Sequence, residues 1–243
     1  MTIAYFVFFH GHPGARIGES DRIGISDILR GTPRLLKAHL FTPTAVNGPF
    51  PNDGHPPQFA LQLYFADLQE LEAVIAPRGH LQALAVPGRF PSLAGTAVTQ
   101  QAMLVRPFPT PSPPNPAIPG QASCSYLVHY PGHAQDLNAW LNHYLSHHPQ
   151  LMRDLPGVRE IEVYTRVDWC DGMPWERVYP MQRNKLVFDS TAALAAALDS
   201  PALHAMRADF RRFPPFFGGN VHYPMMTSTI VGDPIAGAGP VGH

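Results

Sequence analysis

The chain has 243 residues, of which 45% are hydrophobic and 14% are charged, and its formal net charge is −1. This apolar content suffices for one large domain or for two of about 110 residues each. A net charge near zero, without a stripe of basic and aromatic residues, argues against nucleic acid or a membrane surface as a partner. No apolar run approaches the roughly 20 residues of a membrane span, and residues 1–9 lack the basic start of a signal peptide, so we expect a cytoplasmic protein.

The first half of the chain alternates strand and helix patterns. In chain order we expect a strand at 3–9, a helix at 21–36, strands at 38–46 and 59–65, a helix at 67–84 and a strand at 98–105. Glycines and a proline interrupt the first helical pattern, which makes it the weaker of the two. The pattern of the first half of the chain therefore predicts the order strand, helix, strand, strand, helix, strand.

Residues 107–122 contain seven prolines and separate this half from the next. Such a composition favours extended polyproline II structure and opposes a place in a sheet. We expect this segment to be a linker between two domain-sized units.

The second half repeats the same order of elements. We expect a strand at 124–130, a helix at 137–155, strands at 159–167 and 184–188, a helix at 191–210 and a strand at 223–231. In the first of these helices, apolar and aromatic residues recur at spacings of three and four, and Pro156-Gly157 then ends the pattern. The last residues, 233–243, are rich in glycine and proline and predict a flexible tail.

The two halves also resemble each other in sequence. Residues 4–12 correspond to 125–133, and 89–91 return as 212–214 at nearly the same spacing. We therefore expect an α+β fold of two ferredoxin-like β-α-β-β-α-β repeats, over 1–106 and 123–232. Each four-stranded sheet has one face without helices, so pairing of the two sheets into an intramolecular barrel covers both faces.

Short motifs of the second half resemble the EthD-like branch of the dimeric α+β barrel superfamily. They are Tyr126–His133, the histidines before Pro149, Leu155-Pro156-Gly157 and Leu186–Ser190. The resemblance implies the ferredoxin-like fold, paired sheets and a small apolar substrate between sheet and helices. Its relatives include cofactor-free dehydratases, decarboxylases, cyclases, lactone isomerases and oxygenases. The first half matches more weakly, so we interpret it as degenerate and the second half as the active one.

The key histidine of this resemblance has two candidates. The register from Leu-Pro-Gly selects His148, whereas the register from Pro149 selects His147. His148 lies on the apolar stripe of its helix, where it is either a satisfied core residue or a general base at the floor of a pocket. His143 and His147 are four residues apart, a spacing that can hold a metal, but no third ligand is evident, and we expect neither a metal nor a cofactor.

The strand at 124–130 supplies further candidates. Its alternation places Tyr126 and Tyr130 on one face and His129 on the other. A tyrosine facing the helices can donate a hydrogen bond to a substrate oxygen. His133 follows in the next loop, and His222, at the entrance to the last strand, is a candidate second proton carrier.

Aromatic side chains complete the candidate site. Trp175 lies in a loop rich in tryptophan and methionine, which either caps an apolar pocket or packs against the other repeat. The residues expected to contact substrate are Tyr130, His129, Tyr144, Trp175 and Phe217.

These residues predict a cofactor-independent lyase or isomerase. It would use histidine and tyrosine for acid–base chemistry on a small aromatic or polyketide-like metabolite. A cofactor-free or haem-dependent oxygenase and a non-catalytic binder of an apolar metabolite remain as alternatives. The low charge also leaves surface for a homo-oligomer.

Overall fold

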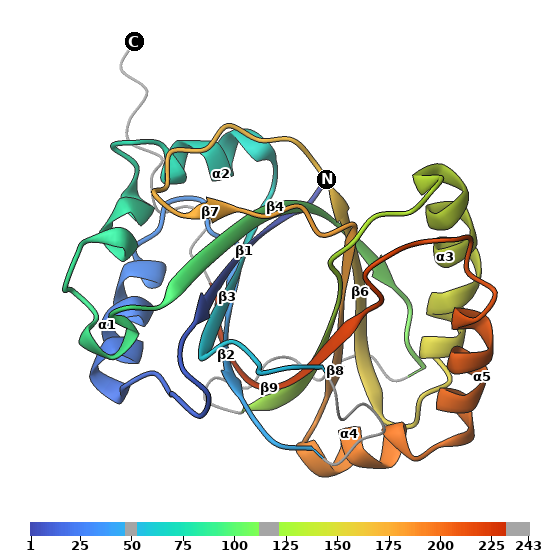
Figure 1. The fold of residues 1–243 in the computed structure, drawn as a ribbon. Coiled ribbons are helices and arrows are strands. Elements are labelled where there is room, and N and C mark those ends of the chain that lie inside the picture. Colours follow the sequence, from blue (N-terminus) through green and yellow to red (C-terminus); the bar gives the residue numbers. More distant parts are fainter. Residues whose placement is uncertain (47–52, 112–121, 232–243) are drawn as a thin grey trace.

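Eight long strands form a closed barrel with the helices on its outside, and Figure 1 views this barrel along its axis. The computed structural model describes residues 1–46, 53–111 and 122–231. The first half supplies β1 (Ile3–His10), α1 (Glu19–Arg30), β2 (Lys37–Pro43), β3 (Phe59–Phe65), α2 (Leu68–Ile75) and β4 (Ala97–Phe108). The second half supplies β5 (Ser123–Tyr130), α3 (Leu137–Met152), β6 (Val158–Arg166), β8 (Gln182–Phe188), α4 (Thr191–Leu198), α5 (Pro201–Phe210) and β9 (Val221–Val231).

The strand order confirms the two β-α-β-β-α-β repeats. The first sheet runs β4-β1-β3-β2 and the second runs β9-β5-β8-β6, all antiparallel. Strand β2 then pairs with β9, and β4 pairs with β6, so each sheet closes on the edges of the other. A two-residue strand, β7 (Glu176–Arg177), lies parallel to the start of β4 and was not expected.

All four expected helices differ from their sequence patterns, and α3 ends at Met152 rather than at residue 155. Helix α1 ends at Arg30 rather than at residue 36, because Gly31 caps it and Pro33 follows. The pattern at 67–84 yields α2 and, after Pro77, a separate 3₁₀ helix, His80–Ala85. The pattern at 191–210 divides into α4 and α5 because Pro201, which has no N–H to donate, occupies the first turn of α5.

Strand β4 extends into the segment assigned to the linker. Pro107 and Phe108 pair with Glu162 and Ile161 of β6, at the seam between the two sheets. Residues 112–121 of the proposed linker, and the proposed tail from 233 onwards, lie outside the described residues.

Alternation along the strands builds three cores from the same sheets. One lies under α1 and α2, another under α3 to α5, and a third fills the barrel. On β5, Tyr126 and Tyr130 pack under the helices while Leu127 points into the barrel, as the pattern predicted. Within the described ranges, no helix has the length and apolarity needed to cross a membrane.

The barrel interior also holds a buried ion cluster. Lys185 is fully buried and lies 2.7 Å from Glu160 and 2.9 Å from Glu162. Tyr64 and Tyr164 each donate a 2.5 Å hydrogen bond to Glu162. These contacts hold the pKa of Glu162 below its usual value despite burial, mainly through the charge of Lys185. The cluster links strands of both repeats across the barrel.

Candidate functional site

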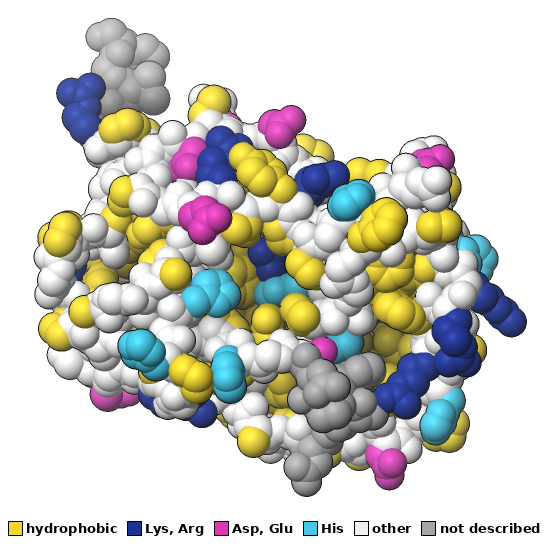
Figure 2. Space-filling view, in the orientation of Figure 1, with side chains coloured by type: hydrophobic (Ala, Val, Ile, Leu, Met, Phe, Trp, Pro, Cys, Tyr) yellow, Lys and Arg dark blue, Asp and Glu magenta, His cyan; other side chains and the backbone are white. Residues whose placement is uncertain are grey.

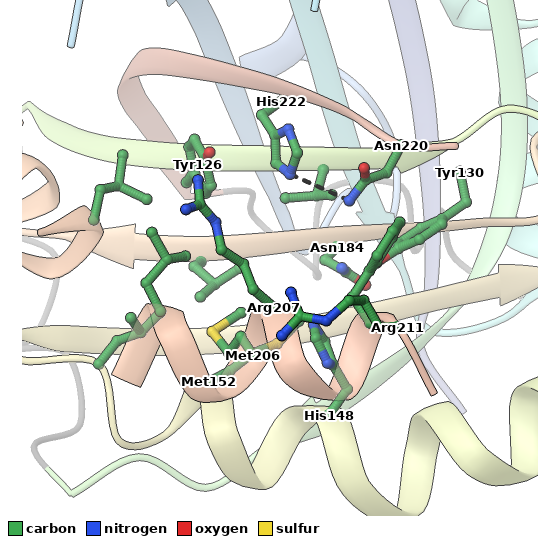
Figure 3. Close-up of a pocket in the computed structure, with 16 residues that line it drawn as sticks. Tyr126, Tyr130, His148, Met152, Asn184, Met206, Arg207, Arg211, Asn220 and His222 are labelled. Atoms are coloured by element: carbon green, nitrogen blue, oxygen red, sulfur yellow. Dashed lines mark hydrogen bonds between the residues drawn. The ribbon is translucent and has the colours of Figure 1, made fainter. Parts of the chain in front are cut away.

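A cavity of about 370 Å³ lies between the outer face of the second sheet and helices α3 to α5. Its size falls within the roughly 300–1,000 Å³ of small-molecule sites. Most of its wall is apolar, from Val128, Met152, Leu186, Leu203 and Phe210. The polar groups that line it come from five elements and the loop before β9, and Figure 3 shows them pointing towards one another. They are Tyr126, Tyr130, His148, Asn184, Arg207, Arg211, Asn220 and His222.

His148 enters this cavity from α3. Helix α3 begins at Leu137 because the Asp136 side chain accepts a hydrogen bond from the N–H of Ala139, and its buried face carries Trp140, Tyr144 and His148. His148 is 4% exposed, and its ring packs against the Tyr144 ring. The sequence thus placed His148 correctly on the face towards the sheet.

The Asp209 carboxylate, on α5, determines which ring nitrogen of His148 carries the proton. Nδ1 of His148 lies 2.9 Å from Oδ2 of Asp209. A carboxylate only accepts hydrogen bonds, so Nδ1 must carry the proton and Nε2 is the nitrogen left to take a proton. Burial lowers the pKa of His148, and Asp209 opposes this shift without reversing it. The ring is therefore neutral near pH 7, as a general base must be.

The other oxygen of Asp209 binds a second histidine. Nε2 of His143 lies 3.1 Å from Oδ1 of Asp209. The His147 ring stacks on the His143 ring at 4.7 Å, and its Nδ1 lies 2.9 Å from the His143 carbonyl oxygen. His147 is exposed and lines a separate depression between α3 and α5, so only His148 of the two candidates reaches the cavity.

A second histidine–aspartate pair stands in the same cavity, on β9. Nδ1 of His222 lies 2.7 Å from Oδ2 of Asp53, and the backbone N–H of His222 donates to the same oxygen at 3.1 Å. Nδ1 again carries the proton, and Nε2 accepts from Nδ2 of Asn220 at 3.3 Å, the contact dashed in Figure 3. Asp53 belongs to the first repeat, so both repeats build this site.

Two tyrosines of β5 provide hydroxyl groups. The Tyr126 ring stacks on His222 with 5.4 Å between ring centroids. Burial raises the pKa of Tyr126, as does the charge of Asp53, while Arg207 opposes the shift. Burial also raises the pKa of Tyr130. Both hydroxyls therefore stay protonated and can donate to an oxygen that gains negative charge.

Two hydrogen bonds hold the amide side chain of Asn184, which lines the cavity. Asn184, on β8, donates to the Tyr144 hydroxyl at 2.5 Å and accepts from Gln182 at 2.8 Å. Tyr144 is itself fully buried beside Tyr130, at 5.6 Å between ring centroids, and does not line the cavity. It therefore acts on a ligand only through Asn184 and Tyr130.

The catalytic candidate His133 and the remaining predicted contact residues lie outside the cavity. The His133 ring packs on Phe217 at 4.9 Å, and both are exposed in the loops beyond β5 and before β9. Trp175 packs against Phe9 and the core of the first repeat, at 6.0 Å between ring centroids. His129 points into the barrel, on the opposite side of the sheet from the cavity.

Sequence reasoning missed the carboxylates and amides of the site. Asp209 is 61 residues from His148, and Asp53 is 169 residues from His222. No local pattern relates residues this far apart. The one usable signal was the helical spacing of Met206, Asp209 and Phe210, which places an acidic residue beside the apolar face of α5.

Arg207, on α5, and Arg211, directly after the last residue of α5, stand at the mouth of the cavity. They make the entrance electropositive, which favours an anion or an oxygen that becomes anionic during a reaction. Among residues 1–46, 53–111 and 122–231, no three histidine, cysteine, aspartate or glutamate side chains form a metal-binding group.

The comparisons with known proteins show the fold. No protein-family model matches the chain, and no curated protein is similar to it in sequence. An anthrone oxidase-like protein of known structure superposes with a TM-score of 0.63 at 15% identity, over 98% of this chain and 96% of that chain. A putative monooxygenase from Lactobacillus acidophilus NCFM gives a TM-score of 0.53 at 11% identity, over 96% of this chain and 100% of that chain.

An EthD family protein from Bacillus halodurans C-125 aligns with 39% of this chain and 94% of its own, at 21% identity. Its TM-score of 0.32 carries no argument for the EthD-like branch. The full-length matches show that this chain has a dimeric α+β barrel fold, with both half-barrels in one polypeptide.

Proposed function

We propose that this protein is an enzyme that removes a proton from a small, largely apolar substrate, with Nε2 of His148 as the general base. The observation that carries the proposal is the His148–Asp209 pair, which keeps Nδ1 protonated and leaves Nε2 basic on a cavity wall. A base placed in this way contributes about 10²- to 10⁴-fold to a rate. Membership of the EthD-like branch, on the motifs of the second half, is part of the proposal.

The other polar groups have complementary roles in this proposal. Removal of a proton from carbon next to a carbonyl moves negative charge onto the carbonyl oxygen. The protonated hydroxyls of Tyr126 and Tyr130 donate to that oxygen, and the guanidinium groups of Arg207 and Arg211 favour the charge. Nε2 of His148 then gives this proton to another carbon of the substrate in an isomerisation, or to a leaving oxygen in an elimination. His222 keeps its own proton on Nδ1, where Asp53 holds it, and supports Tyr126 by stacking on its ring.

A lyase or isomerase reaction therefore suits the site, on an aromatic or polyketide-like substrate with an acidic C–H bond. The apolar wall selects the carbon skeleton, and the carbonyl or phenol oxygen is held by the tyrosines. The first repeat has no histidine in α1, so the proposed chemistry belongs to the second repeat.

An oxygenase is the second candidate, favoured by the same base. A carbanion formed at His148 can react with dioxygen directly, as when anthrone and O₂ give anthraquinone and water. The similarity in fold to an anthrone oxidase-like protein and to a monooxygenase of Lactobacillus makes this reaction worth testing.

Anthrone is a suitable probe for both candidates. Under nitrogen in D₂O, the protein should accelerate exchange of the acidic C10 protons, followed by NMR. The variant His148→Gln should lose about 10²- to 10⁴-fold of this acceleration. His147→Gln is the matched control, because His147 is the neighbouring histidine and lies outside the cavity. Loss in His147→Gln instead, or full activity in a folded His148→Gln, would refute the assignment.

Dioxygen separates the candidates. Oxygenation predicts anthraquinone formation in air with uptake of one O₂ for each anthrone, whereas a lyase or isomerase is indifferent to O₂. An absorbance spectrum of the purified protein tests the haem-dependent alternative through a Soret band. Saturable binding of anthrone without exchange or conversion would instead indicate a carrier, and no binding would exclude this substrate class.

A further inference from the structure

A second cavity, of about 490 Å³, opens at one end of the barrel interior. Figure 2 shows a hollow near the centre of this face, with Lys or Arg and His side chains in it. The cavity is lined by ends of β1, β4, β5, β8 and β9 and by the segment that contains β7. Its main side chains are Phe8, His10, His129, Tyr179, Arg183, Val221 and Tyr223.

Alternation in the sheet places this cavity behind the one already described. On β8, Arg183 faces the barrel and Asn184 faces the helices; on β9, Tyr223 and His222 divide in the same way. The two cavities therefore share strands but lie on opposite faces of one sheet. A ligand in the barrel does not occupy the site of His148.

Arg183 is the unusual residue of this cavity. It is 4% exposed, and its guanidinium lies over the Phe8 ring at 4.6 Å. Its Nε donates to Oε1 of Gln101 at 3.1 Å, and Nη1 donates to Nδ1 of His129 at 2.7 Å. Both partners are uncharged.

Comparison with Lys185 shows what Arg183 lacks. Both residues face the barrel from β8, two positions apart, and Lys185 is neutralised by Glu160 and Glu162. Within the parts of the chain that the structure describes, no carboxylate forms an ion pair with Arg183. Glu176 also lines the cavity, but its side chain is exposed, and it forms no ion pair with Arg183 among the described residues. A buried cation without an anion is unfavourable, so an anionic ligand would bind strongly here.

The neighbours of Arg183 are arranged as hydrogen-bond donors. Because Nδ1 of His129 accepts from Arg183, the proton of this ring is on Nε2. Burial and the charge of Arg183 lower the pKa of His129, so the ring stays neutral. Burial raises the pKa of Tyr223, which keeps its hydroxyl protonated. Arg177 and Glu176 also line the cavity with opposite charges, and the Arg177 guanidinium packs on the Trp169 ring at 3.8 Å. The buried part of the cavity thus presents the Arg183 charge and neutral donors beside aromatic walls.

We propose that the barrel cavity is a second binding site, for a small organic carboxylate whose anionic end pairs with Arg183 and whose apolar body packs between Phe8, Tyr179 and Val221. A guanidinium binds a carboxylate through two parallel N–H groups, and one uncompensated positive charge matches a monoanion. The aromatic wall favours a carboxylate on a planar ring. This site is independent of the chemistry at His148.

Calorimetric titration with benzoate, and with benzamide as its uncharged counterpart, tests the site. We expect one saturable binding event for benzoate, at least tenfold tighter than benzamide and weakened by salt. Arg183→Gln should weaken benzoate binding at least tenfold. Arg211→Gln, which removes an arginine from the mouth of the other cavity, should leave it within twofold.

A second variant tests the site even if Arg183→Gln does not fold. Val221→Trp narrows the cavity while keeping Arg183, and it should also weaken benzoate binding at least tenfold with an unchanged circular dichroism spectrum. The proposal is overturned if the wild type does not bind benzoate, if benzamide binds equally well, or if a folded Arg183→Gln or Val221→Trp binds as the wild type does. Loss of binding in Arg211→Gln alone would place the benzoate in the other cavity and would likewise overturn it.

Discussion

Replacing Asp209 with asparagine should disable the proposed base while keeping its position. In the wild type, the carboxylate accepts from Nδ1 of His148 at 2.9 Å and from Nε2 of His143 at 3.1 Å. An amide has one acceptor oxygen and one donor nitrogen, so it cannot accept from both rings. When its NH₂ group faces His148, it requires an unprotonated Nδ1, and the proton moves to Nε2. The nitrogen on the cavity then donates and cannot take a proton from the substrate.

The magnitude follows from these contacts. Loss of the general base predicts a fall of about 10²- to 10⁴-fold in the rate of anthrone exchange, or about 3–5 kcal/mol of activation free energy. A buried partner left unsatisfied costs about 1–3 kcal/mol of folding stability. Typical domains have about 5–15 kcal/mol, so Asp209→Asn should remain folded.

The assay compares exchange rates and their pH profiles. Protonation of His148 stops the reaction, so the wild-type rate should decrease as the pH is lowered through the pKa of His148. Because burial lowers this pKa, the decrease should occur at a pH lower than the ordinary histidine value of about 6.5. In Asp209→Asn the influence that raises this pKa is gone, and any residual activity should persist to lower pH. His143→Gln, which removes only the other contact of Asp209, is the control and should stay within a few-fold of wild type. A folded Asp209→Asn with the wild-type rate would refute the reasoning.

Three further predictions concern stability. Burial lowers the pKa of three buried histidines, so the unfolded chain binds more protons than the folded protein as the pH falls below about 6.5. The free energy of unfolding should then fall by up to about 1.4 kcal/mol per pH unit for each histidine. Urea unfolding at pH 7.5 and 5.5 measures this, and equal free energies at the two pH values would contradict it. These residues are His39, His129 and His148. Lys185→Met leaves the buried Glu162 and the half-buried Glu160 without their cation and should cost about 3–5 kcal/mol in urea unfolding. A neutral result would show that the cluster contributes nothing. A methyl group on Gly132 would overlap the Phe217 carbonyl, so Gly132→Ala should lower the free energy of unfolding by about 1–3 kcal/mol. Gly24→Ala, within α1, should raise it by about 0.5–1 kcal/mol. Melting temperatures of the two variants that move in the same direction would refute this pair of predictions.

Local patterns were enough to predict the barrel, because each strand carries its own alternation. On β5 the period of two assigned Tyr126 and His129 to opposite faces, and the structure places them there. Helix ends were less predictable, since Pro201 restarts a helix that composition alone would continue. Helix propensity is averaged over a segment, whereas the end of a helix can depend on the missing N–H group of a single proline.

The site was predicted only in part, because its chemistry depends on distant partners. The sequence identified His148 and His222 as candidates but did not connect them with Asp209 and Asp53, which set their tautomers. Charge compensation inside the barrel was equally hidden. Lys185 and Arg183 look alike in the sequence, and only the packed strands show that one has glutamates beside it and the other has neutral groups.

The reciprocal seams, β2 with β9 and β4 with β6, tie the folding of the two repeats together. Either repeat alone would present two bare strand edges and the apolar inner face of an open sheet, which invites aggregation. The β2–β9 seam cannot form until β9 has been made, so closure of the barrel must wait for that strand, and its assembly is intrinsically slow. Ribosomal synthesis thus leaves the first repeat exposed for the time needed to translate the second, and this interval is where a chaperone would act.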